Sequence, residues 1–534
     1  MKKLILLSFL SLIIMNNVSV AQSKSKKFNI TFGEEYKASR KSTLGDIIGY
    51  DETGIYALKQ TSKGFGGMFY DFDLEHYDNK MNLTKTRELT LEQGGNKRKY
   101  EYTIQLNDQL YIFSSFRDKK KAKNFLFIQS LNKKTLQPDK DIKMIADINY
   151  KGYTRFNAGF YDFRISSDSS KVLVFYNKPY DKGTPEKFGF QVYNNKMEKL
   201  WSKEVKLRYR EELFSVERFR VDNEGNVYLL GIIYKDKAKA KRKGKPNYKY
   251  QVLAWTKQGE DYKEYPVQIS GKFITDMQIT IADNGNIICA GFYSDYGTFS
   301  IKGTYFLTID SKTEEVISKN MKEFSLDFLT QNMSERKAEK TAKKAAKGKD
   351  TEMYDYELDD IIRRSDGGAI LIGEQFYIRV VVTSSTSSSG STTYTTHYYY
   401  YYNDIIVINI NPDGIIEWAT KIPKYQMSRD DGGFFSSYTT SIMEGRLFFI
   451  FNDNPKNLYL QKGKRPANYL PAKESISVVV EVDAEGNLEK EALFTSEKKD
   501  IKIRPKVSEQ ISETELVLYG ERKKVKGLVK VTLK

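Results

Sequence analysis

One phrase recurs along this chain of 534 residues: an apolar-alternating run, a polar turn and a second apolar run. Its clearest copy is FRVDNEGNVYLLG, residues 219–231, whose turn ends at Gly225. Runs of this kind around turns rich in Gly, Asn and Asp indicate β-hairpins. Aligned on the turn, copies fall at eight positions, Gly54, Asp108, Ser170, Gly225, Gly285, Gly368, Gly445 and Thr514. The two longest intervals between copies contain low-complexity insertions at 332–355 and 383–402.

A second hairpin follows each copy, as in residues 404–410, NPDG and 415–422. Trp201 and Trp418 occupy matching places in their copies. Four antiparallel strands, A to D, in each repeat are typical of a β-propeller blade. We therefore predict an all-β fold, a single propeller of eight four-stranded blades, with seven blades as the alternative and two smaller β domains as the rival architecture.

The amino-acid sequences of two hairpins resemble the seven-bladed β-propeller repeat family of secreted bacterial proteins. VDNEGNVYLLG, residues 221–231, is similar to the first hairpin of that repeat, and DIIVININPDGIIEW, residues 404–418, to the second. The resemblance implies a fold and brings no catalytic residues with it. The family is named for seven blades, whereas this chain contains eight copies of the repeat.

The two ends of the chain indicate how the ring closes. The last copy stops at a third strand, Lys526 to Leu533, while Phe28 to Tyr36 is a strand-like run without a partner of its own. The N-terminal run should supply the missing outer strand and cover an open edge. Residues 334–349 read as a short surface helix, with Ser334 as its N-cap and Gly348 at its end.

The first 21 residues have the features of a secretory signal peptide. Lys2 and Lys3 precede an apolar run, Leu4 to Met15, and Ser19-Val20-Ala21 follows as a cleavage site. We expect residues 22–534 to form one domain, exported to the periplasm or cell surface, with no transmembrane segment in the mature chain. The single cysteine, Cys289, lies in an apolar run, which is typical of a buried, inert thiol.

Basic residues concentrate in the connections on one side of the predicted ring. In a propeller the A–B and C–D turns share one face, and the B–C and D–A connections share the other. Four segments of the second kind, 117–123, 235–249, 334–349 and 452–475, carry net charges of +4, +7, +5 and +3. Together they exceed the +15 that remains of the chain's +17 without Lys2 and Lys3.

Such loops are either solvated surface or a site for a polyanion, and we expect the partner to be an acidic polysaccharide or an acidic envelope protein. Export argues against nucleic acid as a physiological ligand. The candidate polyanion-binding residues are Lys119, Lys120, Lys121, Lys239, Lys241, Arg242, Lys243, Lys340, Lys343, Lys344, Lys464 and Arg465.

Carboxylates recur at the starts of the A strands, which line the central channel of a propeller. They could ring its mouth and hold a cation, or they could pair with Arg164, Arg218, Arg220 and Arg363. We favour the pairing. The candidate carboxylates are Asp46, Asp162, Glu217, Asp276, Asp359 and Asp360.

Tyr398, Tyr400 and Tyr402 belong to a tyrosine run that either extends strand C of the sixth repeat or stacks on sugars or peptide.

No enzyme motif occurs, and the two histidines, His76 and His397, fall in different repeats on opposite faces. No cofactor and no metal site is predicted. The sequence favours a non-catalytic binding or scaffolding propeller of the bacterial envelope. A carboxylate-dependent carbohydrate-active enzyme using the channel mouth, or a structural component of an envelope assembly, are the alternatives.

Overall fold

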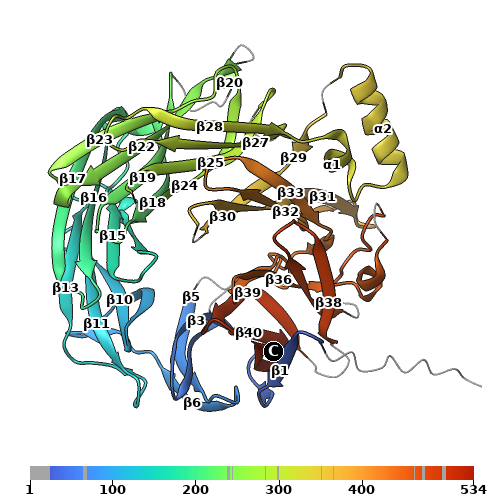
Figure 1. The fold of residues 1–534 in the computed structure, drawn as a ribbon. Coiled ribbons are helices and arrows are strands. Elements are labelled where there is room, and N and C mark those ends of the chain that lie inside the picture. Colours follow the sequence, from blue (N-terminus) through green and yellow to red (C-terminus); the bar gives the residue numbers. More distant parts are fainter. Residues whose placement is uncertain are drawn as a thin grey trace, which may run out of the picture.

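Eight antiparallel sheets of four or five strands follow one another around a ring (Figure 1). The computed structural model describes residues 25–63, 69–236, 241–242, 245–282, 284–297, 300–349, 351–364, 366–461, 464–471, 475–495 and 501–534. Each turn position aligned in the sequence lies between the first two strands of one sheet or, for Gly54, at the first residue of the second strand, so the repeat predicted the units correctly. The β-propeller architecture is confirmed.

The first four sheets use consecutive strands, as follows. Sheet 1 contains β3 (Ser42–Asp51), β4 (Gly54–Lys63), β5 (Phe69–Tyr77) and β6 (Leu83–Glu88). Sheet 2 contains β9 (Lys99–Leu106), β10 (Gln109–Asp118), β11 (Lys123–Asn132) and β13 (Lys143–Asn149), with short β12 (Gln137–Pro138). Sheet 3 contains β14 (Phe160–Ile165), β15 (Lys171–Asn177), β16 (Pro185–Asn194) and β17 (Lys199–Arg210). Sheet 4 contains β18 (Phe214–Val221), β19 (Val227–Tyr234), β22 (Tyr248–Thr256) and β23 (Asp261–Val267).

The remaining sheets include the one that joins the two ends of the chain. Sheet 5 contains β24 (Phe273–Ile281), β25 (Ile287–Ser294), β27 (Gly303–Ile309) and β28 (Val316–Glu323). Sheet 6 contains β30 (Tyr356–Arg363), β31 (Ala369–Thr386), β32 (Thr392–Ile410) and β33 (Ile416–Ile422), with β34 (Gln426–Arg429) paired to β32. Sheet 7 contains β35 (Thr439–Met443), β36 (Arg446–Asp453), β37 (Ile476–Val482) and β38 (Leu488–Thr495). Sheet 8 contains β39 (Lys502–Gln510), β40 (Glu515–Arg522), β41 (Val525–Leu533) and β1 (Phe28–Phe32), with β2 (Tyr36–Lys37) also on β41.

Short elements decorate the connections between these strands. The two-stranded pairs are β7 (Glu92–Gln93) with β8 (Asn96–Lys97), β20 (Lys241–Arg242) with β21 (Lys245–Pro246), and β26 (Ser300–Ile301) with β29 (Met353–Tyr354). The helices are α1 (Leu326–Thr330) and α2 (Glu335–Ala346), and 3-10 turns lie at Arg155–Asn157, Glu211–Leu213, Lys257–Gly259 and Pro455–Tyr459. Among the described residues, no helix is both long and apolar enough to cross a membrane.

The N-terminal strand closes the ring, as the unpaired ends of the sequence predicted. β1 pairs antiparallel with β41, Phe28 opposite Leu533, and Tyr36 of β2 lies opposite Lys526. The edge of β41 is thereby covered, which removes a template for pairing with other chains.

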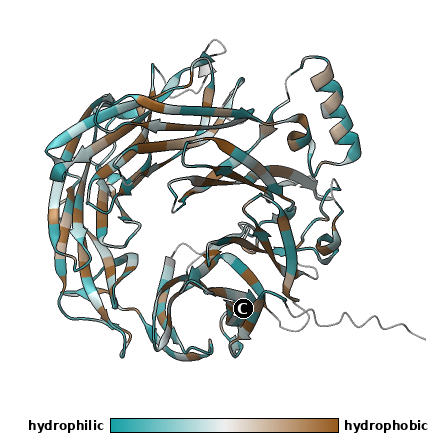
Figure 2. Cartoon of the chain, in the orientation of Figure 1, coloured by the Kyte–Doolittle hydropathy of each residue, from teal (hydrophilic) through white to brown (hydrophobic). Residues whose placement is uncertain are grey.

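The hydrophobic core is divided among the interfaces between neighbouring sheets. Each of the eight core clusters joins two successive sheets. One of them packs Leu44 and Ile47 of sheet 1 against Val507, Val517 and Tyr519 of sheet 8. The hydrophobic residues therefore run along the strands in Figure 2, since both faces of each sheet are covered.

The turns repeat one local device. In the β18–β19 turn, the backbone N–H of Asn226 donates to Asp222 Oδ1 at 2.8 Å, and Gly225 adopts a φ of +87°. The β37–β38 turn uses the same contacts, with Asn487 donating to Asp483 at 2.7 Å. Turn chemistry therefore accounts for these Asp-x-x-Gly-Asn strings.

Two tryptophans at matching places tie neighbouring sheets together. The indole N–H of Trp201, on β17, donates to the carbonyl of Gly225 in the next sheet at 3.0 Å. The indole N–H of Trp418, on β33, donates to the carbonyl of Ala484 in the next sheet at 2.7 Å. Each tryptophan thus buttresses a turn of the following repeat.

Candidate functional site

A cavity of about 460 Å³ lies between α2 and sheet 6, at the outer side of the ring. Its walls come from five segments, which are the α1–α2 region, β29, the base of the β31–β32 hairpin, the end of β33 and residues 465–466. These are D–A and B–C connections, so the cavity opens on the loop-rich side of the ring. A volume of this size falls in the range of about 300–1,000 Å³ that is usual for ligand sites.

Helix α2 forms the roof of the cavity. Ser334, Lys337, Thr341 and Lys344 line it, and their spacing of three and four residues places them on one face of the helix. The helix ends at Gly348, whose φ is +63°, with its N–H bonded to the carbonyl of Ala345. Both ends of this helix agree with the prediction, although the Ser334 side chain makes no capping hydrogen bond.

The floor carries a buried lysine. Lys421, 2% exposed, donates from Nζ to the carbonyl oxygen of Phe328 at 2.6 Å and lies 4.7 Å from the centre of that ring. Burial lowers the pKa of Lys421 to about 8, and the charge of Asp404 opposes this shift. Burial also raises the pKa of Asp404. Burial and the charge of Asp404 therefore act on the pKa of Lys421 in opposite directions.

A second lysine anchors the cavity wall to sheet 7. Lys424 Nζ lies 2.5 Å from Glu374 Oε1 and 3.0 Å from the carbonyl oxygen of Tyr402. The other carboxylate oxygen of Glu374 accepts from Ser437 Oγ at 2.7 Å. Because these groups satisfy one another, Lys424 is a fixed part of the wall and has little capacity for a ligand.

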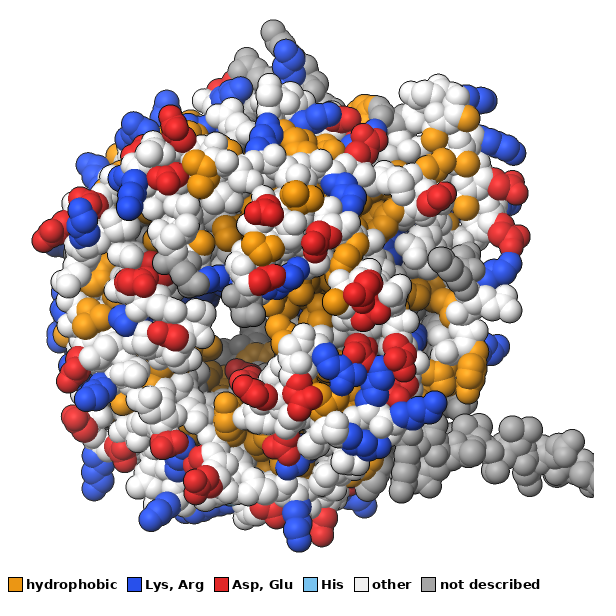
Figure 3. Space-filling model, in the orientation of Figure 1, with side chains coloured by type: hydrophobic (Ala, Val, Ile, Leu, Met, Phe, Trp, Pro, Cys, Tyr) orange, Lys and Arg blue, Asp and Glu red, His pale blue; other side chains and the backbone are white. Residues whose placement is uncertain are grey.

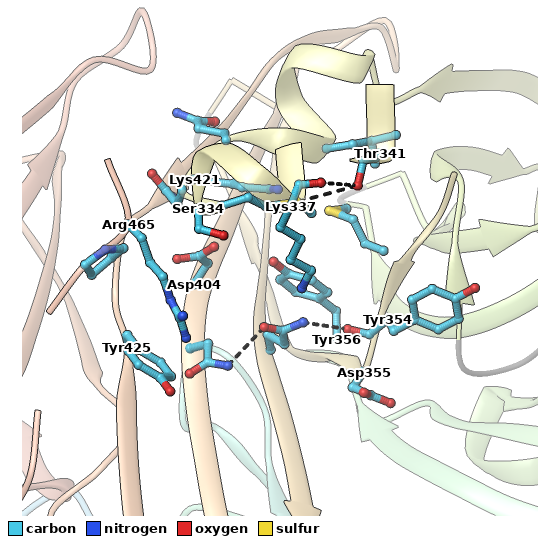
Figure 4. A pocket seen from close by; sticks show the side chains of 18 of the residues that line it. Ser334, Lys337, Thr341, Tyr354, Asp355, Tyr356, Asp404, Lys421, Tyr425 and Arg465 are labelled. Carbon is cyan, nitrogen blue, oxygen red and sulfur yellow. Dashed lines mark hydrogen bonds between the residues drawn. The ribbon is translucent and has the colours of Figure 1, made fainter. Parts of the chain in front are cut away.

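Tyrosines and an arginine form the sides. The guanidinium of Arg465 lies 4.4 Å from the ring centre of Tyr425, and Figure 4 shows the two side chains running side by side. Lys464 Nζ lies 2.5 Å from Glu335 Oε1, which ties this connection to the start of α2. The rings of Tyr377 and Tyr401 are stacked, with centres 4.5 Å apart.

Charge is unevenly distributed around the cavity. Lys337, Lys344 and Arg465 form no ion pair with any acid in the described parts of the chain. By contrast, Glu352 is occupied, because it accepts from Ser294 Oγ at 2.6 Å and from the N–H of Asp295 at 2.9 Å. The lining therefore carries unpaired cations from two separate elements, together with the acids Asp355 and Asp404.

The predicted polyanion-binding residues fall into separate groups around the ring. Lys119, Lys120 and Lys121 lie exposed on the β10–β11 turn of sheet 2. Lys241 and Arg242 form β20, which pairs with β21 in the connection between β19 and β22, whereas Lys239 and Lys243 lie outside the described residues.

The third group gathers at the cavity. Lys340 and Lys343 are exposed on α2, Lys344 and Arg465 line the cavity, and Lys464 pairs with Glu335. Sheets 2 and 6 lie on opposite sides of the ring (Figure 1), and charges at physiological salt are screened over about 8 Å. The basic connections therefore act as separate patches.

Most of the predicted channel carboxylates have partners of their own. Asp162 lies 2.7 Å from Arg164, as the pairing hypothesis stated. Glu217 accepts from Ser215 Oγ at 2.7 Å, and Asp359 accepts from the hydroxyl of Tyr438. Asp360 lies in β30.

Asp276 connects two sheets near the ring axis. Its Oδ2 accepts from the backbone N–H of Leu358 in sheet 6 at 2.8 Å, and burial raises its pKa to about 6. Arginine pairing therefore accounts for only part of this set, because backbone and hydroxyl donors satisfy several of its members.

Asp46 differs, because a second acid lies near it. Loss of hydration raises the pKa of Asp46 to about 6. Loss of hydration also raises the pKa of Glu509, on β39 of sheet 8, to about 7, and the charge of Asp46 adds to this shift. Figure 3 shows acidic side chains beside the central opening. Within the described residues, no group of three His, Cys, Asp or Glu side chains could hold a metal ion.

Tyr398, Tyr400 and Tyr402 extend strand C, as one of the two interpretations predicted. They lie in β32, which pairs with β31 as far as Thr386 opposite Thr392. Opposite residues share a face, so Tyr398 and Tyr400 join Val380 and Ile378 on one side of the hairpin. Tyr377 and Tyr401 lie on the other side, and Tyr377 lines the cavity.

The hairpin projects beyond its own sheet and exposes apolar side chains. β30 pairs with β31 only up to Gln375, and the residues that follow are paired with β32 alone. Ile378, Val380 and Val382 are 46%, 54% and 60% exposed and alternate along one face.

Sequence reasoning missed most of the cavity. Lys421, Asp404 and Tyr377 lie in segments read as ordinary strand, and Glu509 does not share the A-strand position used to select acids. The signal that could have located the cavity was the insertion of 334–349 beside a second long insertion, since long loops often carry sites.

The chain matches no family model and no curated protein. Similar solved structures include the β-propeller domain of the Trilobed protease from Pyrococcus furiosus, with 12% identity over 85% of this chain and 96% of that chain, at a TM-score of 0.35. The WD40 domain of SCAP from fission yeast has 8% identity over 82% and 94% of the two chains, at 0.29. The polysaccharide lyase Uly1 has 9% identity over 94% and 99%, at 0.33. At these scores, no activity and no residue role passes from those proteins to this chain.

Proposed function

We propose that this protein is a non-catalytic binding module of the bacterial envelope that engages an acidic polysaccharide through the loop-rich side of the ring. The proposal rests mainly on Lys337, Lys344 and Arg465, which line the cavity and form no ion pair with an acid in the described residues. The exposed turn at Lys119 to Lys121 adds a second patch on the same side. The likeness of residues 221–231 and 404–418 to a secreted propeller repeat, together with the signal-like N-terminus, supports the location.

A long, flexible polyanion suits this arrangement because it can reach several patches at once. Each exposed lysine contributes little alone, a few tenths of a kcal/mol, so affinity must come from many contacts. Screening weakens every such contact, so binding should fall steeply as salt rises through about 0.15 M.

The test measures binding of heparin and of polygalacturonate at several salt concentrations. Replacing Lys119, Lys120 and Lys121 with Ser should weaken binding about fivefold with no change in melting temperature. The matched control replaces Lys134, Lys196 and Lys312, exposed lysines on C–D turns of the opposite face. Equal losses from both faces would reduce the effect to net charge, and absence of binding at low salt would refute the proposal.

A role as a structural component of an envelope assembly is the second candidate, favoured by the exposed apolar face of the β31–β32 hairpin. Ile378, Val380 and Val382 form an apolar row on a strand whose outer edge is unpaired among the described residues. Exposed apolar rows beside an open edge are typical of interaction surfaces. Replacing Val380 and Val382 with Thr should abolish capture of envelope proteins while leaving polysaccharide binding intact. Capture unchanged by that replacement would exclude the hairpin as the interface.

A further inference from the structure

We propose that the cavity beneath α2 is a specific subsite for one or two acidic sugar residues at the end of a chain. This inference rests on the proposed function and adds the place where the polymer is recognised rather than merely attracted. It concerns a cavity lined by several elements, whereas the exposed turns supply only charge.

The unpaired cations set the charge of the ligand. Lys337 and Lys344 project from one face of α2, and Figure 4 shows Lys337 extending from the helix toward Tyr356. Arg465 approaches from the side, next to Tyr425. On the floor, the buried Lys421 donates to the carbonyl of Phe328 and lies near the charge of Asp404. The unpaired cations of α2 and of Arg465 line the same cavity, which favours an anionic group as the ligand.

The remaining walls set the shape of the ligand. Tyr354, Tyr377 and Tyr425 line the cavity and are all partly accessible. Tyrosine rings offer flat, amphipathic surfaces of the kind on which pyranose rings pack. Gln331 also lines the cavity and can exchange hydrogen bonds with hydroxyl groups. An anionic group, a flat face and several hydroxyls together describe a uronic acid or a sulfated sugar.

The site is preorganised. Gln375 Nε2 donates to the carbonyl of Tyr354 at 2.9 Å and its Oε1 accepts from Asn403 Nδ2 at 3.1 Å, the chain of bonds drawn in Figure 4. The buried Lys424–Glu374 pair fixes the wall behind. Fixed walls reduce the entropy lost on binding, so a short oligosaccharide should bind without the help of the other patches.

The experiment measures binding of a uronate tetrasaccharide, a sulfated tetrasaccharide and a neutral tetrasaccharide by calorimetry at physiological salt. The acidic tetrasaccharides should bind and the neutral one should not. Whichever acidic form binds more tightly identifies the anionic group as carboxylate or sulfate. The double variant Lys337→Met with Arg465→Met should lose at least tenfold in affinity, because charge-assisted hydrogen bonds are removed.

The same helix provides the control. Lys340→Met with Lys343→Met removes two charges from a face of α2 that does not line the cavity, and should change affinity less than twofold. Ser334→Trp fills the roof without changing charge. It should abolish tetrasaccharide binding and leave the melting temperature unchanged, since Ser334 makes no side-chain cap bond.

The outcomes separate this inference from the proposed function. Polygalacturonate binding without tetrasaccharide binding, or equal losses in the two helix pairs, would overturn the subsite while the proposed function stands. Binding of an acidic peptide more tightly than any tetrasaccharide would overturn the sugar class. Failure of both polymer and tetrasaccharide to bind would overturn both.

Discussion

The ammonium group of Lys424 lies 2.5 Å from a carboxylate oxygen of Glu374, and neither side chain is more than 4% exposed. This pair stands between β31 and the segment that follows β33, directly behind the cavity wall. A buried pair of this kind fixes geometry, because each charge depends on the other for compensation. Its properties lead to the first of four predictions.

Breaking this pair should be far more costly than breaking an exposed one. Lys424→Met leaves Glu374 as an uncompensated buried carboxylate and should lower the free energy of unfolding by about 3–5 kcal/mol. Lys464→Met, which breaks the exposed pair with Glu335, should cost about 0–1 kcal/mol. Denaturant unfolding measures both, and similar costs would contradict the buried network.

The N-terminal strand should be essential for ring closure. Phe28, 2% exposed, packs edge-on against Phe448 of sheet 7 at 5.1 Å between ring centres. Phe28→Ala should therefore cost about 3–5 kcal/mol, and removal of residues 526–534 should cause aggregation. Phe156→Ala, at an 83% exposed ring, serves as the control and should cost under about 0.5 kcal/mol. Unchanged melting after that truncation, which removes β41 and leaves β1 without its partner, would show that the ring is held without the β1–β41 pairing.

The packing of tryptophan against the turns should make two turn glycines differ in the cost of replacement by alanine. Gly225 and Gly486 both have positive φ, +87° and +82°, so alanine is strained at each by about 1–2 kcal/mol. An added Cβ at Gly486 would lie only 2.7 Å from the ring of Trp418, while at Gly225 the nearest atom is 3.5 Å away. Gly486→Ala should thus cost more than Gly225→Ala and alter tryptophan fluorescence. Equal costs would mean that Trp418 yields without penalty.

The acids near the ring axis should make stability depend on pH. The pKa values of Asp46 and Glu509 are raised to about 6 and about 7 in the folded protein, above an unfolded value of about 4. The folded state then binds more protons between those limits, so these groups lower stability as pH rises from about 4 to 7. Asp46→Asn and Glu509→Gln should raise the melting temperature at pH 8 and leave it unchanged at pH 4. A gain of equal size at both pH values would show that ionisation is not its cause.

The repeated phrase was sufficient to predict the strands, their grouping into sheets and the join between the two ends. Alternation and turn residues are local signals, and a sheet interface needs only apolar residues at alternate positions, as at Leu44, Ile47 and Val517. The short helix was predicted for the same reason, since its end signal at Gly348 is local.

The candidate site required tertiary structure. Sequence could not decide which face of the β31–β32 hairpin would meet the cavity, because residues on its two faces alternate and only the folded chain places Tyr377 in the lining. The sequence also could not show that Lys421 of β33 and Lys337 of α2 line the same cavity. The sequence by itself determined the repeat and its closure, because both follow from local hydropathy and turn chemistry. Only the tertiary structure decided which charges meet and which are left unpaired, because burial and distance between remote residues govern electrostatic interactions.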